Sequence, residues 1–402
     1  MSNSIRECDC LSEELPGKTL KRYFTVAMLV FLAAFLFLPN SKLVNTFYYG
    51  FIALPALVVL VLGRVGRLEF RGVTRLWLAL FVWIAASGSF AGHAKFYKDL
   101  GYVVLFCLVI WRLVEPRVFD NPLVLRSFFW GLASYVVMSV VYFWVLGQFS
   151  FGQRILDLPG RLSGPIFTSM LLVVCYARLL PLWWESRKWL EGVAGLAFLL
   201  LCVGLVLQSR SGLVGIVALF GFVGLFLISY GSSRARAVFF GGASLLLLTS
   251  AWFLNSTPLG ESLVTRADSH RLELWSAYLR EWDDCGWLLG CGYSHAGAVI
   301  DIGGEMILHP HNIFLTMGFY GGLLALGLFI VALFSTLMVA LRQRNPWGGV
   351  LLLSLVMLNF DGQKIIASPD ELWLLVWLPA MLIVARVHQE RNDRTAKMLA
   401  AD

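Results

Sequence analysis

The residue of this chain that is best placed to do chemistry is His311, which stands with Asn312 directly before a long apolar run, 313–341. An imidazole can accept a proton near neutral pH, so a histidine where a membrane meets water is a candidate general base. The same His-Asn pair would also suit ordinary capping of the helix that follows. The neighbouring charges therefore have to decide between the two interpretations.

Three arginines, Arg210, Arg266 and Arg271, fall in segments that the charge pattern assigns to the same side of the membrane as His311. Arg210 lies between two apolar runs with almost no loop, where a charge is costly unless it is paired or faces water. A guanidinium group can donate two hydrogen bonds to one phosphate. A base beside such arginines predicts chemistry on an anionic, lipid-linked substrate, although snorkelling or solvated arginines would give the same pattern.

Other residues of the outer segments are candidates for substrate contact. Asn312 could hold a sugar hydroxyl, and Trp275 and Tyr293 could stack on sugar rings, although most aromatic residues of such a chain belong to the core or to interfacial belts. Arg154 and Arg161 lie in a second outer segment, 147–165, which is expected to lie in the interface. All five are predicted to belong to the substrate-binding region.

The sequence shows no recognisable metal site. The histidines near His311 and the carboxylates of Asp301 and Glu305 are not joined by ligand spacing. We therefore expect no metal and no other cofactor. Cys285 and Cys291 share one outer loop and could form a disulfide in an oxidising compartment, or could remain free in a glycine turn.

Composition places the elements that must carry these residues in a membrane. The chain has 402 residues, of which 58% are hydrophobic, and its mean hydropathy is +0.75. These values exclude a soluble domain of this size and predict an all-α polytopic membrane protein. The first apolar run lacks a convincing cleavage site, so it is interpreted as a true span and not as a signal peptide.

Apolar runs predict about twelve transmembrane helices, some short enough to be tilted or re-entrant. The predicted spans are 23–39, 45–63, 76–91, 99–114, 127–146, 165–182, 189–207, 212–230, 237–254, 312–340, 346–360 and 370–387. They divide the chain into helices 1–9 (1–254), a loop domain (255–311), and helices 10–12 with a tail (312–402). The loop domain is expected to form a small helical cap, with a helix over 269–282 whose apolar face carries Leu272, Trp275 and Leu279.

Charge predicts the orientation of these spans. Roughly two thirds of the 32 Lys and Arg residues fall in segments on one side, which is therefore inside, together with both termini. The net charge of +7 is accounted for by this bias, so we expect membrane lipids and no nucleic acid as partners. His311 and the loop domain are predicted to face outward.

With these residues in place, the chain resembles the O-antigen ligase and polymerase superfamily, and its ligase branch most. The resemblance rests on SRSG at 209–212, RLELW at 271–275, GCGY at 290–293, and His311-Asn312 followed by Gly322, and it covers roughly residues 205–330. The family pattern usually ends in Gly-x-x-Gly, whereas this chain has Ala325 at the last position. Alanine is still small enough for close helix packing.

The resemblance implies a membrane fold like that of GT-C glycosyltransferases and a periplasmic active site on the bacterial inner membrane. It implies a metal-independent, inverting transfer of polysaccharide from undecaprenyl pyrophosphate to a sugar hydroxyl of lipid A–core oligosaccharide. His311 would act as the base, and Arg210, with Arg266 or Arg271, would hold the pyrophosphate. Polymerases and protein O-oligosaccharyltransferases of the same superfamily, and a lipid-linked glycan transporter of a different class, remain alternatives. Spans with few charges disfavour the transporter.

Overall fold

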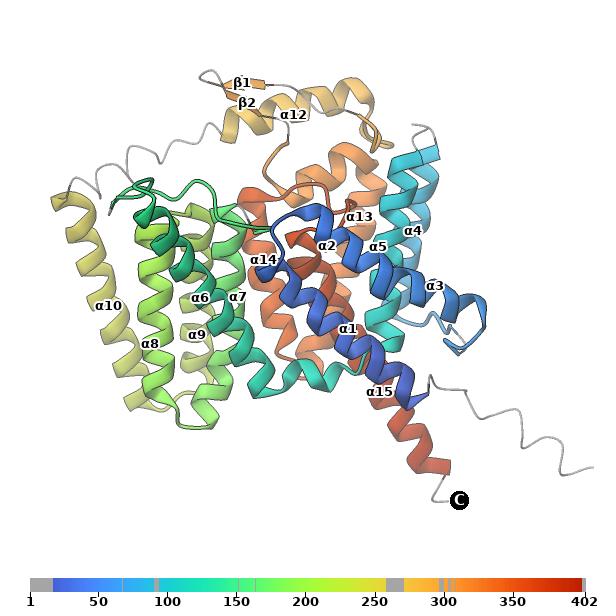
Figure 1. The fold of residues 1–402 in the computed structure, drawn as a ribbon, viewed down its shortest axis with the longest axis horizontal. Coiled ribbons are helices and arrows are strands. Elements are labelled where there is room, and N and C mark those ends of the chain that lie inside the picture. Colours follow the sequence, from blue (N-terminus) through green and yellow to red (C-terminus); the bar gives the residue numbers. More distant parts are fainter. Residues whose placement is uncertain are drawn as a thin grey trace, which may run out of the picture.

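The computed structural model describes residues 17–66, 68–89, 94–150, 152–162, 164–257, 271–295, 300–302, 305–307 and 309–399. In these residues the protein is a bundle of long helices with one small two-stranded sheet (Figure 1). The helices and helical turns of the bundle are α1 (Lys18–Phe37), α2 (Ser41–Tyr48), η2 (Tyr49–Ala53), α3 (Leu54–Val61), α4 (Val73–Ser89), α5 (Ala94–Leu108), η3 (Val109–Leu113), η4 (Pro116–Asp120), α6 (Pro122–Val145), α7 (Pro165–Glu185), α8 (Trp189–Leu201), η5 (Cys202–Val206), α9 (Arg210–Tyr230), α10 (Ser233–Ser256), α13 (Ile313–Arg342), α14 (Trp347–Asp361), η6 (Trp373–Trp377) and α15 (Leu378–Leu399).

Each predicted span falls on a helix or on consecutive helical segments of this bundle. Among the described residues, seven helices are long and apolar enough to cross a membrane, and α4 and α14 are shorter apolar helices. These helices support the prediction of a helical protein that crosses the membrane several times. The number of twelve spans and the likeness to the GT-C fold remain predictions.

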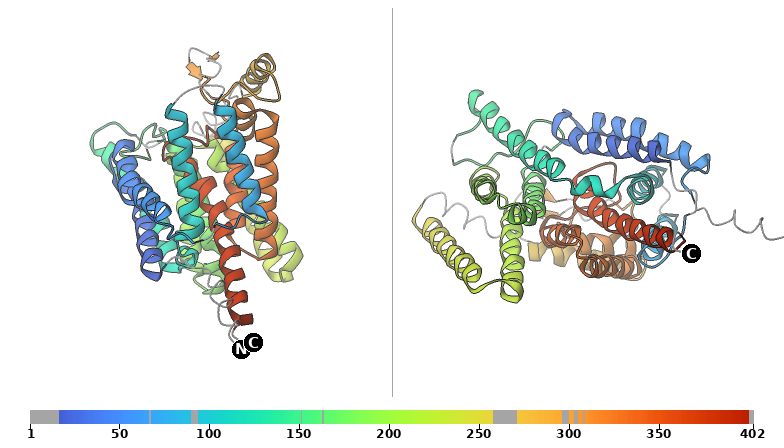
Figure 2. Two further views of the ribbon diagram at one scale, coloured as in Figure 1. Left: turned by 90° about the vertical axis from the view of Figure 1, so that its right-hand side faces the viewer. Right: turned by 90° about the horizontal axis from the view of Figure 1, so that it is seen from below.

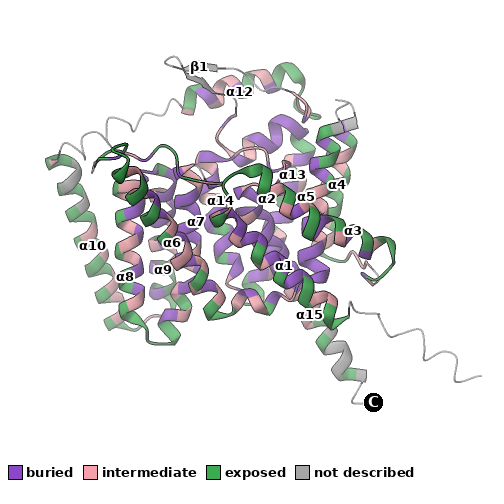
Figure 3. Cartoon of the chain, in the orientation of Figure 1, coloured by how far each residue is buried: buried purple, intermediate pink, exposed green. Residues whose placement is uncertain are grey.

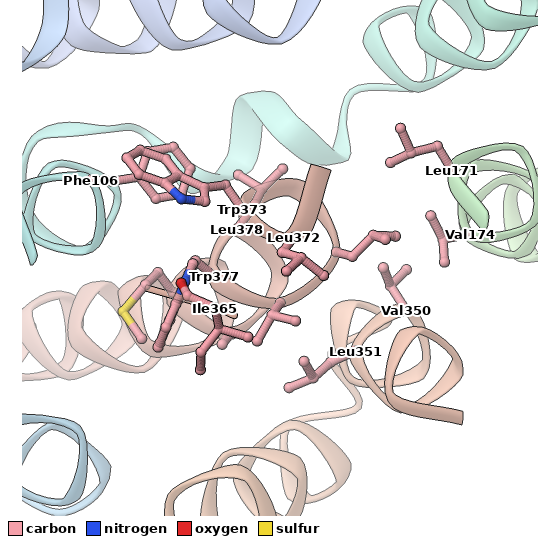
Figure 4. Packing of buried hydrophobic residues seen from close by; sticks show 14 of the residues in the cluster. Phe106, Leu171, Val174, Val350, Leu351, Ile365, Leu372, Trp373, Trp377 and Leu378 are labelled. Carbon is pink, nitrogen blue, oxygen red and sulfur yellow. The ribbon is translucent and has the colours of Figure 1, made fainter. Parts of the chain in front are cut away.

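The core of the bundle is filled by aromatic and aliphatic side chains from helices that are far apart in the sequence. Trp373 and Trp377 of η6 are fully buried, and the Trp373 ring lies 4.7 Å from that of Phe106 on α5 (Figure 4). Between helices in a membrane, such packing stabilises the bundle mainly through van der Waals contact. Burial concentrates in α13, α14 and α15, whereas α10, at the edge of the bundle, is mainly exposed (Figure 3). Its exposed leucines suit contact with lipid.

The remaining described elements lie together at one end of the bundle: α12 (Arg271–Cys285), β1 (Ile300–Ile302) and β2 (Glu305–Ile307) (Figures 1 and 2). The two strands pair antiparallel, with Asp301 opposite Met306. The chain leaves through α15 at the opposite end (Figure 2). A helical piece in this segment was predicted, and the hairpin was not.

The predicted apolar face of the cap helix is wrong. Leu272 and Leu279 are exposed, and the buried face of α12 carries Leu274, Tyr278 and Trp282 instead. Both sets recur at helical spacing, so periodicity alone could not separate them. The face with the larger aromatic area is buried, because it packs on α13, where the Tyr278 ring lies 5.0 Å from that of Phe319.

Candidate active site

The carboxylate of Asp361 gathers the most polar contacts near His311. Its Oδ1 lies 3.0 Å from Nδ1 of His311, and its Oδ2 lies 3.3 Å from Nη2 of Arg271. The hydroxyl of Ser211 donates a further hydrogen bond to Oδ2. The Asp361 side chain is only 8% exposed and that of His311 is 27% exposed. A buried carboxylate thus joins four segments of the chain at the end of the bundle that carries α12.

Backbone geometry explains how His311 reaches Asp361. Gly322 interrupts α13 with φ 76° and ψ 179°, a region essentially restricted to glycine. The first turns of α13 therefore leave the axis of the remaining helix, and the start of α13 meets the end of α14. The contact is so close that a Cβ on Gly362 would clash with the backbone of Ile313. The kink at Gly322 thus positions His311 beside Asp361.

Two helices begin at this cluster, α9 and α13, and both are capped by side chains. Ser209 accepts a hydrogen bond from the backbone N–H of Gly212 at 3.2 Å. Asn312 accepts from the N–H groups of Phe314 and Leu315 at 2.9 and 3.0 Å. The capping interpretation of Asn312 is therefore correct, and its Nδ2 lies 3.4 Å from Oδ1 of Asn359. The positive ends of two helix dipoles meet here, which favours an anion.

The residue before each cap has a left-handed backbone. Gln208 has φ 43° and His311 has φ 51°. Such values are uncommon outside glycine, and they concentrate at functional sites. The two turns that present Arg210 and the imidazole therefore share the same unusual geometry.

Arg271 and Arg210 are electrostatic neighbours. Burial lowers the pKa of the Arg271 guanidinium, the Asp361 carboxylate opposes this shift, and the charge of Arg210 lowers the pKa further. Arg271 also lies over the ring of Phe360 at 5.4 Å. Two cations beside a single carboxylate leave one excess positive charge, which favours a bound anion.

His309 lies directly against the site. Its ring centroid is 4.2 Å from that of His311. Burial lowers the pKa of His309 to about 4, and the neighbouring His311 contributes to this shift. His309 is therefore neutral at pH 7, and it cannot compete as a cation for the substrate or for Asp361.

The cap helix is attached to the site at several points. Trp275 Nε1 donates to the carbonyl of Pro310 at 2.9 Å, next to His311. Beyond α12, the disulfide between Cys285 and Cys291 closes a turn that docks on the kink of α13. The N–H of Cys291 donates to the Phe319 carbonyl at 2.7 Å. The pairing that the sequence left open is thus present, and it braces the helix that carries Arg271.

Other predicted residues fall in different places. Arg154 Nε donates to the carbonyl of Leu207 at 3.2 Å, three residues before Arg210, so it borders the site. Arg161 lies in an ion pair with Glu371 at 2.7 Å. This contact links the 152–162 segment to the residues just before η6.

Tyr293 is buried, its ring stacks on that of Phe96 at 5.0 Å, and its hydroxyl donates to the sulfur of Met317. These contacts assign it to the core and do not place it beside Asp361. Arg266 lies outside the described residues.

Asp361 and Ser211 were not singled out from the sequence. Asp361 ends an apolar helix and stands fifty residues after His311, so no local spacing connects them. One signal was available: a carboxylate at a helix C-terminus opposes the helix dipole, and such a local conflict often marks a site.

Among the described residues, one group of side chains is close enough to hold a metal ion: Cys285, Cys291 and His295. Both sulfurs of that group form the disulfide, so the group fits a structural bridge better than a cation site.

Comparison with known proteins gives one informative similarity. The chain is 28% identical over 303 residues to a protein of Pseudomonas aeruginosa named O-antigen ligase, and the match covers 72% of this chain and 70% of that protein. No protein-family model matches the chain.

Proposed function

We propose that the chain, which is similar to a protein named O-antigen ligase, is itself such a ligase and transfers O-antigen polysaccharide from undecaprenyl pyrophosphate to a sugar hydroxyl of lipid A–core. The observation that carries this proposal is the contact between His311 and Asp361, beside two arginines and two helix N-termini. A role in the assembly of O-antigen and lipopolysaccharide follows from the similarity itself. The donor, the acceptor and the mechanism are parts of the proposal.

His311 serves as the base for the acceptor hydroxyl. Its Nδ1 is engaged with Asp361, so Nδ1 carries the proton and Nε2 is the nitrogen that accepts one. Asp361 fixes this tautomer and stabilises the imidazolium that forms, as in other Asp-His pairs. Asp361 is thus a positioning residue, since it acts through the histidine.

The arginines hold the leaving group. The acceptor oxygen attacks the anomeric carbon, the bond from that carbon to the pyrophosphate oxygen breaks, and the hydroxyl proton passes to Nε2. The negative charge that develops on the pyrophosphate is stabilised by Arg210, Arg271 and the N-terminus of α9. In-line displacement inverts the anomeric centre. Arg266 remains a candidate third cation.

The reaction is placed on the periplasmic face of the inner membrane. The charge bias favours this orientation, and the disulfide lies at the same end of the bundle as His311, as expected for an oxidising compartment. The acceptor distinguishes this reaction from that of a polymerase, which would extend a lipid-linked glycan.

Purified protein supplied with lipid-linked polysaccharide and lipid A–core tests the proposal. Transfer should fall roughly 10²–10⁴-fold in His311→Ala, the usual contribution of a general base. Arg210→Lys should also lose most activity, because lysine keeps the charge but cannot form the two-pronged contact with phosphate. Full activity of a well-folded His311→Ala protein would remove the histidine from the mechanism.

A further inference from the structure

A cavity with charged walls is lined by residues at the start of α4 and by residues of α15. These parts of α4 and α15 lie at the end of the bundle away from α12 (Figures 1 and 2). Its volume is about 190 Å³. Polar side chains of its wall include Arg71, Thr74, Trp111 and Arg391. None of these residues takes part in the site around His311, so the cavity needs its own explanation.

Positive charge exceeds negative charge at this cavity. Of its described lining residues Glu69 alone is acidic, and it lies 3.1 Å from Arg71 and 4.0 Å from Arg391. One carboxylate therefore faces two guanidinium groups that are about half exposed. A third, Arg112, is buried behind them and contacts His388 on the cavity wall. The electrostatic surplus favours an anion.

A further hydrogen-bond donor belongs to the lining of the same cavity. Trp111 is only 8% exposed, and its Nε1 has no hydrogen-bond partner among the described residues. An indole N–H that is buried without a partner is costly, and a ligand oxygen would satisfy it. The first turn of α4, at Val73 and Thr74, also lines the cavity. The helix dipole adds positive potential at this end of α4.

The rest of the wall is aliphatic. Val339 of α13 and the α15 residues Ile383, Val384 and Val387 form it. The cavity lies at the predicted inner ends of four spans, where phospholipid headgroups meet the bilayer core. A cationic rim above aliphatic side chains suits a phosphodiester with acyl chains better than a soluble anion.

We propose that this cavity binds the phosphate headgroup of an anionic phospholipid of the inner leaflet. Arg71 and Arg391 pair with the phosphate, Trp111 donates to one of its oxygens, and the aliphatic wall receives the start of an acyl chain. The bound lipid joins α4, η3, α13 and α15 at their inner ends. The proposal does not depend on the reaction at the other end of the molecule.

Thermal unfolding of the detergent-purified full chain, titrated with phosphatidylglycerol, phosphatidylcholine or inorganic phosphate, tests the site. Phosphatidylglycerol should raise the apparent Tm at lower concentrations than phosphatidylcholine does. The variant Arg71→Gln/Arg391→Gln should weaken its apparent affinity roughly 30-fold, from about fivefold per arginine. Trp111→Phe, which keeps the ring and removes the donor, should weaken it about fivefold.

A matched control is Arg234→Gln/Arg236→Gln, which removes two charges from another predicted inner loop outside the cavity. It should bind phosphatidylglycerol like the wild type. Equal response to both lipids, saturation by inorganic phosphate alone, or equal loss in the two double variants would each overturn the proposal.

Discussion

Asp361 organises the site at the scale of single residues, because its two oxygens serve His311, Arg271 and Ser211 at once. Replacement by Asn keeps the size but places an N–H₂ group opposite at least one donor. The imidazole then loses its fixed tautomer. We predict that Asp361→Asn lowers transfer by at least ~10²-fold, measured with purified protein.

Asp99→Asn is a suitable control for that prediction. Asp99 is also a buried carboxylate, it accepts a hydrogen bond from Ser368 at 2.9 Å, and it does not contact His311. Its variant should keep near-normal transfer. Equal losses in the two variants would mean that Asp361 acts only through stability.

His309 should make the fold sensitive to acid. Its pKa is lowered to about 4 from an ordinary value of 6.5. Between pH 4 and pH 6.5, His309 is therefore protonated in the unfolded chain and neutral in the folded protein. The contribution of neutral His309 to the free energy of unfolding is complete above pH 6.5. It falls as the pH drops toward 4, and it does not decrease further below that pH. The loss amounts to roughly 3 kcal/mol.

Thermal unfolding in detergent across this pH range measures the effect. His309→Gln, which does not titrate, should flatten the dependence of Tm on pH in this window. An unchanged slope in the variant would assign the acid sensitivity to other groups.

Some residues of the candidate site could be predicted from the sequence, and others could not. His311 and Arg210 could be singled out because each stands beside a long apolar run, and Arg271 because it stands near the start of the predicted cap helix, on the same side. Asp361 could not, because its partnership depends on the kink at Gly322, which no periodicity reveals. The ion pair of Arg161 with Glu371 likewise depends on tertiary contact.

At the scale of elements, the site depends on how α12 is held. The Cys285–Cys291 turn supplies hydrogen bonds to α13 where Gly322 interrupts that helix; the Leu323 N–H, for example, donates to the carbonyl of Trp287 at 2.9 Å. The start of α12 carries Arg271 to Asp361. Arg271 and the disulfide therefore lie at opposite ends of the single helix α12.

Removal of the disulfide should make the position of α12 relative to α13 less fixed. We predict that Cys285→Ser/Cys291→Ser lowers stability by roughly 2–3 kcal/mol and reduces transfer more at elevated temperature than at low temperature. Thiol reductant should affect the wild type in the same way and leave the double variant unchanged. A wild-type protein that is fully active and equally stable in reductant would contradict the prediction.

At the scale of the whole molecule, most of the helical layout could be predicted, because apolar runs of bilayer length are the strongest signal in a membrane protein. The predicted spans fall on helical segments. The arrangement of the elements described at the α12 end of the bundle could not be predicted, since short polar segments such as β1 and β2 carry little periodicity.

The arginines at the α12 end of the bundle also predict that the leaving group is stabilised without a metal ion. Arg210 and Arg271, with Arg266 as a further candidate, can neutralise a departing diphosphate with fixed geometry and no exchangeable ion. Transfer by purified protein should therefore persist in excess EDTA, and added magnesium or manganese should raise the rate little. A rate that collapses with chelator and returns with metal would overturn the arginine account.

The banding pattern of lipopolysaccharide from a deletion strain tests most directly whether the protein is an O-antigen ligase. The same strain is also complemented with the wild-type chain or with His311→Ala. We expect the deletion strain to lose the O-antigen ladder, keep an intact core band and accumulate lipid-linked polymer. The wild-type chain should restore the ladder, and His311→Ala should not. A band with a single O-antigen repeat would indicate a polymerase, and an unchanged ladder in the deletion strain would contradict the assignment of ligase activity.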